Sequence, residues 1–144
     1  MQHLRHTFIL AIIGILAACT QQAAPEPGPK KFEEHQTSEL AQLMRDMHQD
    51  MLHVRDQIQD GQPLPEYTPR YTHITSAAMT QEHMRTDAFE AYAQQILQIE
   101  KEMYQAAPEQ QRAHYQTLVQ NCIACHQAIG CTGPITKIKK LEIQ

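Results

Sequence analysis

Three residues near the C-terminus have the types and the spacing that could carry chemistry. In the segment NCIACHQ, residues 121–127, Cys122, Cys125 and His126 form the pattern Cys-x-x-Cys-His. Two thiols with an adjacent imidazole could attach a haem covalently, hold a zinc ion or form a redox-active dithiol. Cysteine and histidine occupy only 4 and 9 of the 144 positions, which is too few for chance to explain the pattern. The elements that position these residues separate the three alternatives.

The N-terminus predicts that the chain is exported from a bacterial cytoplasm. A short polar start containing Arg5 is followed by an apolar run over residues 8–18. A membrane-spanning helix needs roughly twenty such residues, so residues 1–18 are typical of a signal peptide instead. The segment LAAC, residues 16–19, resembles the bacterial lipobox, and we expect Cys19 to be lipidated and to become the new N-terminus. Ordinary secretory cleavage nearby is the alternative, and either membrane, inner or outer, could hold the anchor.

Residues 19–36 predict a flexible tether ahead of one folded domain, residues 37–144. Within the tether, residues 20–31 hold three prolines and a glycine and show no apolar periodicity. The full chain has a formal net charge of −4, and removal of residues 1–18 takes away one arginine, leaving about −5. An acidic domain without a basic cluster predicts no nucleic-acid partner.

From residue 38 onward, apolar residues recur at steps of three and four, which predicts α-helices. The expected helices cover residues 38–60, 69–84, 87–106 and 109–130. Ser38 and Asp87 could cap the first and third, Gly61 could stop the first, and Pro108 suits the first turn of the fourth. No segment alternates as a strand would. The predicted fold is therefore all-α, an antiparallel four-helix bundle with short connections.

The opening motif then lies late in the last helix, with Cys122 and His126 on one face. A haem needs this arrangement, because the two thiols reach its vinyl groups along one edge while the imidazole reaches back to the iron. Zinc could use Cys131 as a fourth ligand, but zinc motifs usually pair two separated couples. A redox dithiol needs a helix N-terminus, usually in an α/β domain. Haem attachment fits the predicted elements better than either.

These features resemble those of the four-helix-bundle c-type cytochromes, the cytochrome c prime group and its methionine-ligated low-spin relatives. The resemblance covers the export signal, the helical pattern over residues 37–130 and the sequence CIACH in the last helix. It implies that one haem c is attached covalently through Cys122 and Cys125, with His126 as the proximal iron ligand.

The distal iron ligand is expected on the first helix, because the first and last helices of such a bundle are antiparallel neighbours. We expect Met44, or alternatively Met47, although methionines on an apolar face often only fill a core. A leucine over the iron would instead leave a five-coordinate site open to NO or CO. Ligation by His48 is a third possibility, but its neighbours Gln49 and Asp50 predict that it faces water.

Other residues have less specific expectations. Tyr115 shares a helix face with Cys122 and could pack on the haem or bond a propionate, or simply belong to the core. Cys131 would be a free thiol, an intermolecular link or part of the turn that ends the last helix. Residues 135–141 predict a short amphipathic helix with its lysines outward. The remaining histidines are expected to face water: His35, His53, His73, His83 and His114.

The expected function is that of a membrane-tethered monohaem electron carrier on the periplasmic side, exchanging electrons with redox partner proteins. No group looks placed to activate a substrate, so an enzyme is not expected. A gas-binding haem protein for NO or CO is the first alternative, and a non-haem helical lipoprotein that binds zinc is the second. Formation of a homodimer is a further possibility, because helix bundles with an exposed helix face often dimerise.

Overall fold

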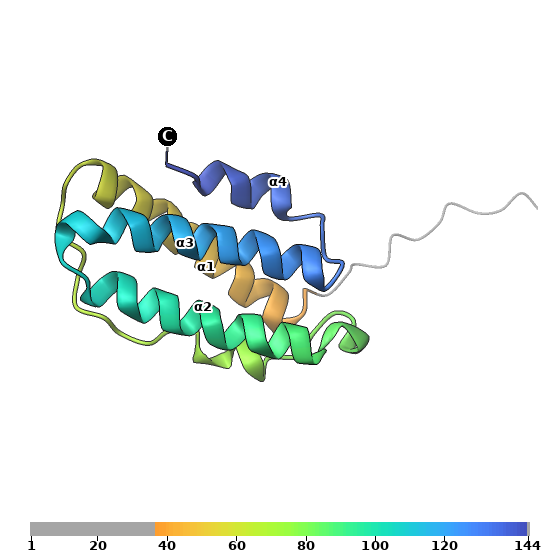
Figure 1. Cartoon of the computed structure of the whole chain (residues 1–144). Helices are drawn as coiled ribbons and strands as arrows, with labels where there is room; N and C mark the ends of the chain where they lie inside the picture. Colours follow the sequence, from red (N-terminus) through yellow and green to blue (C-terminus); the bar gives the residue numbers. More distant parts are fainter. Residues whose placement is uncertain (1–36, 144) are drawn as a thin grey trace, which may run out of the picture. The chain divides into compact units, whose positions relative to one another are not determined.

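The computed structural model describes residues 37–143, and over this range the chain forms helices and no strand. The predicted all-α class is therefore confirmed. The described elements, in chain order, are α1 (Glu39–Gln59), η1 (Thr72–Thr75), η2 (Glu82–Met84), α2 (Asp87–Gln105), α3 (Pro108–Ala128), α4 (Ile135–Ile138) and η3 (Lys139–Leu141), where η marks a 3-10 helix (Figure 1).

The ends of the long helices follow from local hydrogen bonding. Ser38 caps α1, because its hydroxyl accepts a hydrogen bond from the N–H of Ala41 at 3.2 Å. Gly61, at a φ of 66°, ends the same helix as expected, since this conformation costs glycine little. Pro108 is the first residue of α3, where its missing N–H costs no hydrogen bond. The expected cap of α2 is wrong by one residue, because Thr86 and not Asp87 accepts from the first turn.

The helix expected over residues 69–84 is wrong. Only the short 3-10 helices η1 and η2 form there, joined by irregular chain. The hydroxyls of Thr75 and Ser76 each reach a carbonyl three residues back, at 3.5 Å, and such local bonds compete with the α-helical pattern. The apolar residues of the segment are buried nonetheless, with Ile74 only 1% exposed. The described part of the chain therefore has three long helices where four were expected.

Residues 60–86 form a crossover that returns the chain to the end of the molecule where α1 begins. The N–H of Leu40 donates to the carbonyl of Ala78 at 3.0 Å, and Arg85, just before α2, donates to the carbonyl of Ala77 at 2.6 Å. Helices α1 and α2 therefore start at the same end and run in parallel. Only two residues separate α2 from α3, so α3 runs opposite to both (Figure 1).

After α3 the chain reverses at Gly130, whose φ is 75°, and residues 135–143 return along the bundle. Arg55 of α1 donates to the carbonyl of Lys140 at 3.0 Å, and Gln120 of α3 donates to Glu142 at 2.9 Å. The C-terminal segment thus lies over both α1 and α3, as the view in Figure 1 also shows for α4 and α3. Its apolar side chains are buried and its lysines exposed, which confirms the predicted amphipathic character.

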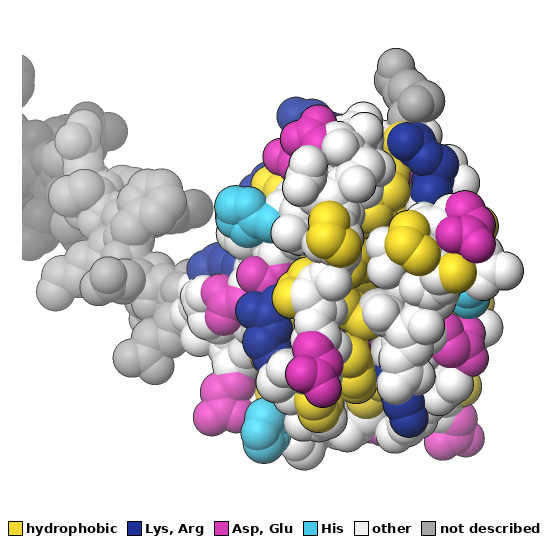
Figure 2. All heavy atoms as spheres, turned by 90° about the vertical axis from the view of Figure 1, so that its left-hand side faces the viewer, with side chains coloured by type: hydrophobic (Ala, Val, Ile, Leu, Met, Phe, Trp, Pro, Cys, Tyr) yellow, Lys and Arg dark blue, Asp and Glu magenta, His cyan; other side chains and the backbone are white. Residues whose placement is uncertain are grey.

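One hydrophobic core joins the described elements. Its largest side chains with less than 2% exposure are Tyr115, Phe89, Ile74, Met103 and Val119, contributed by α3, α2 and the crossover. On the end of the molecule shown in Figure 2, acidic and basic side chains alternate, and hydrophobic ones show between them. That face therefore presents no field of positive charge of the kind that nucleic acid requires.

The expectations about export and anchoring concern residues that the structure does not describe. The signal peptide of residues 1–18, the lipidated Cys19 and the tether up to residue 36 all lie outside residues 37–143. Within those described residues, no helix combines the length and the apolar character that crossing a membrane requires.

Candidate haem site

The motif residues occupy the last two turns of α3. Cys122 and His126 share one face of the helix, and both are partly buried. Cys125 is only 3% exposed and lies on the side of α3 that also carries Asn121, which is buried as well. The helical spacing of four residues therefore places one thiol and the imidazole side by side, as the sequence predicts.

The imidazole of His126 is held by the turn that follows α3. Its Nδ1 lies 2.9 Å from the carbonyl oxygen of Cys131, the residue after the reversal at Gly130. Because a carbonyl oxygen can only accept, Nδ1 carries the hydrogen and donates it. The other ring nitrogen, Nε2, then has the free lone pair that a metal ligand needs, and metal-binding histidines are usually oriented by such a bond. Cys131 thus helps to orient His126 through its backbone carbonyl and not through its thiol.

The environment of the thiols disfavours a redox dithiol. Burial first, and then the neighbouring thiol in each case, raises the pKa of Cys122 to about 12 and that of Cys125 to about 11. Reactive pairs of the thioredoxin kind have lowered pKa values, which keep a thiolate available. The three described cysteines are also free, with no disulfide among them.

The geometry gives no support to a zinc site either. Zinc held by Cys122, Cys125, His126 and Cys131 would need those four side chains to converge on one point. Among residues 37–143, no three histidine, cysteine or carboxylate side chains are arranged to hold a metal ion.

The face of α3 that carries Cys122 and His126 looks toward α1. The hydroxyl of Tyr115, two turns earlier on this face, donates to the carbonyl of Met51 on α1, 3.2 Å away. Because the two helices are antiparallel, moving seven residues forward on α3 corresponds to moving seven back on α1. Cys122 therefore lies at the level of Met44, in the first half of α1, where the sequence places the distal side of the haem.

The three candidate distal residues on α1 differ in their surroundings. Met47 is 7% exposed and belongs to the core, and Met44 is partly buried against it. His48 was expected to face water, and this expectation is wrong: the residue is partly buried, and its Nε2 is buried without any hydrogen-bond partner. His48 lies two turns before Arg55 on this flank of α1, and Arg55 bonds the C-terminal segment at the carbonyl of Lys140.

Tyr115 itself is fully buried and links three elements of the core. Its hydroxyl lies 2.9 Å from the carbonyl of Leu141 in addition to its contact with Met51. Burial accordingly raises the pKa of Tyr115. These bonds give the tyrosine the core position that the sequence left as one of two roles, and contact with a haem stays a prediction.

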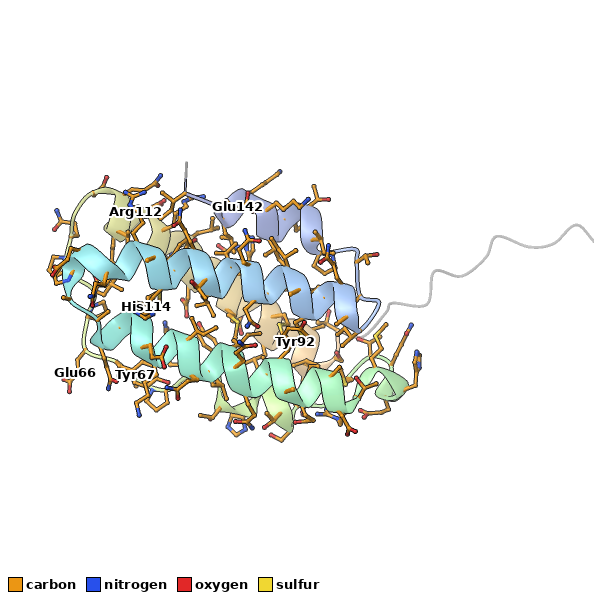
Figure 3. The ribbon with its side chains drawn as sticks, viewed as in Figure 1. Glu66, Tyr67, Tyr92, Arg112, His114 and Glu142 are labelled. Atoms are coloured by element: carbon orange, nitrogen blue, oxygen red, sulfur yellow. The ribbon has the colours of Figure 1, made fainter. Side chains whose placement is uncertain are left out.

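Three of the other described histidines face water, as expected, and His114 is partly buried. His53, His73 and His83 are exposed, and His35 lies outside the described residues. His114 points from α3 toward α2, where its Nδ1 lies 4.0 Å from a carboxylate oxygen of Glu102 (Figure 3). None of them joins the motif.

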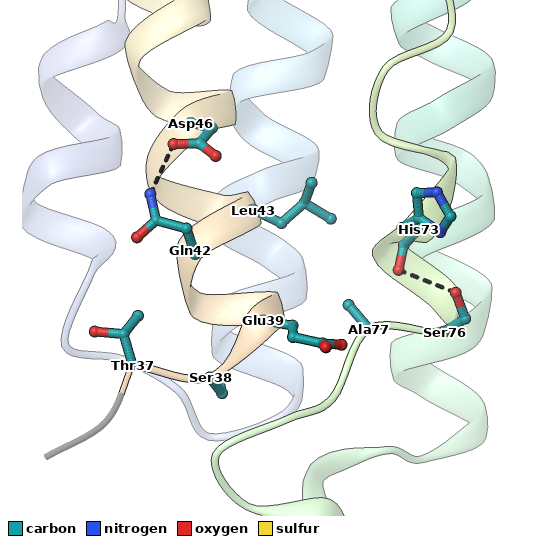
Figure 4. Close-up of a pocket in the computed structure, with 9 residues that line it drawn as sticks. All are labelled: Thr37, Ser38, Glu39, Gln42, Leu43, Asp46, His73, Ser76 and Ala77. Atoms are coloured by element: carbon teal, nitrogen blue, oxygen red, sulfur yellow. Dashed lines mark hydrogen bonds between the residues drawn. The ribbon is translucent and has the colours of Figure 1, made fainter.

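Two polar features of the structure were missed by reasoning from the sequence. The first is a hollow of about 520 Å³ between the start of α1 and η1, with Glu39, Asp46 and His73 among its lining residues (Figure 4). It lies on the side of α1 turned to the crossover. No signal in the sequence indicates it, because it depends on the path of residues 60–86.

The second feature is a buried polar cluster between α1, the crossover and α2. Arg70 pairs with Asp50 at 2.7 Å, and Tyr71 donates a hydrogen bond to the same carboxylate. Glu100 is 6% exposed, and its Oε2 has no hydrogen-bond partner. Burial, and secondarily the charge of Asp50, raises the pKa of Glu100 to about 7, against the opposing effect of Arg70. The sequence offered one indication of this cluster, because Glu100 is a charged residue on the apolar face of its helix.

No family model, curated protein or solved structure matches the chain. The candidate site therefore depends on the geometry of this chain's own residues, and its strongest element is the imidazole of His126, oriented by the turn at Cys131 on the same helix end as the thiols of Cys122 and Cys125.

Proposed function

We propose that the protein is a membrane-tethered monohaem c-type cytochrome that transfers electrons on the periplasmic side of a bacterial membrane. The observation that carries the proposal is the motif Cys122, Cys125 and His126 on the last turns of α3, with the His126 Nδ1 bonded to a backbone carbonyl. That bond leaves Nε2 as a free ligand atom, which is what a proximal histidine requires. The raised pKa values of both thiols disfavour dithiol exchange and are compatible with thioether bonds.

Each residue of the motif has a separate role in the proposal. Cys122 and Cys125 attach the haem and fix its edge to α3, and His126 supplies the proximal ligand. A bound haem c supplies a single electron that it gains and releases at its iron. The face of α1 opposite Cys122 would close the site, and the sequence offers Met44, Met47 and His48 there as candidates for the distal ligand. A closed, six-coordinate site suits electron transfer better than the binding of a substrate.

The proposed location rests on the N-terminal sequence. Signal cleavage before Cys19 and lipidation of its thiol would anchor the domain, and residues 20–36 would hold it off the membrane surface. The exposed lysines of the C-terminal segment, Lys137, Lys139 and Lys140, offer a positive surface for an acidic redox partner.

Covalent haem attachment is the test of this proposal. The full chain is produced in a host with an intact cytochrome c maturation system, and haem is measured by denaturing gel and by its pyridine complex. We expect one haem per chain that survives denaturation, and its loss in the double variant Cys122→Ser/Cys125→Ser.

Cys131→Ser is the matched control, because it removes a third thiol from the same region while the backbone carbonyl that orients His126 remains. We expect this variant to retain its haem. A wild-type chain without covalent haem would refute the proposed function, and retention of zinc by that chain would direct attention to the non-haem alternative. Binding of CO by the reduced wild type would instead favour a gas-binding site.

A further inference from the structure

The buried ring nitrogen of His48 has no partner in the protein. Its Nε2 is one of three buried side-chain nitrogen or oxygen atoms in the described residues that make no hydrogen bond. Burying such a group without a partner opposes folding, so nearly all buried polar atoms in proteins are paired. An unpaired nitrogen in this position therefore calls for a partner that the chain alone does not contain.

The methionines on the same stretch of α1 need no such explanation. Met44 and Met47 are packed against the hydrophobic core. A thioether is weakly polar and fills apolar space without a hydrogen bond, so their burial is accounted for by packing. Among the candidate distal residues of α1, only His48 has a buried ligand atom without a hydrogen-bond partner.

The direction of side chains on the two helices brings His48 and His126 to the same level. The Tyr115 contact with Met51 places Cys122 opposite Met44 on the antiparallel pair. Side chains of a helix lean toward its N-terminus, so the ring of His126 leans back to the level of Cys122. On α1 the ring of His48 leans back toward the level of Met44. The two imidazoles therefore reach toward one level of the bundle from opposite helices.

We infer that His48 is the distal ligand of the haem, so that the iron is held between two histidines, one from α1 and one from α3. This inference rests on the proposed function. The Nε2 of His48 would offer its lone pair to the iron with the ring hydrogen on Nδ1, so that no proton would be released. Compared with a methionine, a second imidazole would lower the reduction potential, and with two protein ligands the iron would be closed to gases.

Electronic spectra and reduction potential of the haem-loaded full chain test the inference. Wild type should show a low-spin spectrum in both oxidation states, without the weak far-red absorption that a methionine sulfur gives to ferric haem. His48→Ala should lose the low-spin spectrum of the reduced protein and gain CO binding. Met44→Leu and Met47→Leu should keep the wild-type spectrum.

Two further variants separate ligation from folding. His48→Met retains an iron-binding side chain, and we expect it to remain six-coordinate, gain the far-red absorption and show a raised potential. His53→Ala removes an exposed histidine from the same helix and should change neither the spectrum nor the potential.

The outcomes distinguish this inference from the proposed function. A chain with covalent haem whose His48→Ala variant stays low-spin, or whose wild type shows the methionine absorption, overturns the role of His48 and leaves the cytochrome proposal intact. A wild-type chain that attaches no haem overturns both.

Discussion

The hydroxyl of Tyr115 on α3 links this helix to α1 and to the C-terminal segment. It contacts carbonyls of Met51 on α1 and Leu141 in the C-terminal segment, at 3.2 and 2.9 Å, from a fully buried position. Tyr115→Phe should lower the free energy of unfolding by about 1–2 kcal/mol, because the buried carbonyl of Leu141 loses its donor and the substitution creates little empty space. Urea denaturation measures this change as a shift of the midpoint with an unaltered slope.

Tyr92→Phe is the control for this prediction. Tyr92 of α2 is partly buried and is labelled in Figure 3, and no hydrogen bond of its hydroxyl is seen in the described structure. We expect its midpoint to match that of the wild type. Equal effects of the two substitutions would show that the Tyr115 bonds contribute nothing specific.

Single residues show where reasoning from the sequence succeeds at this site. Cys122 and His126 could be placed on one face because helical spacing is a local property. The burial of His48 could not be predicted, because it depends on tertiary packing around α1 and not on the neighbours of His48 in the sequence. The polar neighbours of His48 wrongly indicated that it faces water, because neighbours in the sequence do not show what packs against a helix.

At the scale of elements, Arg85 fastens the crossover to the start of α2. Its guanidinium donates to the carbonyls of Thr75 and Ala77, both at 2.6 Å, and is only 25% exposed. Arg85→Lys keeps the charge but replaces a two-pronged donor by a single ammonium, so one carbonyl loses its partner. We expect a loss of about 1–2 kcal/mol in the free energy of unfolding, measured by chemical denaturation.

Arg112→Lys tests whether any exchange of arginine for lysine has this effect. Arg112 of α3 is exposed (Figure 3), and we expect its substitution to leave stability unchanged within about 0.5 kcal/mol. A similar loss of stability in both variants would contradict the prediction that the carbonyl bonds of Arg85 stabilise the fold.

The ends of the helices were predictable where capping or helix-stopping residues mark them in the sequence. Ser38, Gly61 and Pro108 mark helix ends through local hydrogen bonding and backbone freedom, and the structure confirms all three. The crossover was not predictable, because its buried residues, such as Ile74, recur at nearly helical steps. The segment instead forms 3-10 turns, and Arg85, ten residues beyond Thr75, bonds the carbonyl of Thr75, a contact that no local pattern indicates.

At the scale of the whole molecule, the cluster around Glu100 makes stability depend on pH. The pKa of Glu100 is raised from 4.5 to about 7 in the folded protein, chiefly by burial. The folded state therefore holds this proton more tightly than the unfolded chain does, and the contribution to stability falls as pH rises from about 4.5 to about 7. The full effect is at most about 3 kcal/mol.

Glu100→Gln should remove this dependence. The variant should gain stability relative to the wild type as pH rises from 5 to 8, and urea denaturation at each pH measures the difference. Glu109→Gln, an exposed substitution in the first turn of α3, provides the control and should show a constant difference. A difference for Glu100→Gln that does not vary with pH would contradict the prediction.

The crossover also bears on the order in which the molecule assembles. Helices α2 and α3 are separated by two residues, so their pairing closes a short loop and forms early. The docking of α1 onto α3 closes a loop that includes the whole crossover and α2, and it is the slower event. The face of α3 that carries Cys122 and His126 is covered only in that second step. We therefore expect a folding stage in which Cys122 and His126 are already on a formed helix and still open to an incoming molecule.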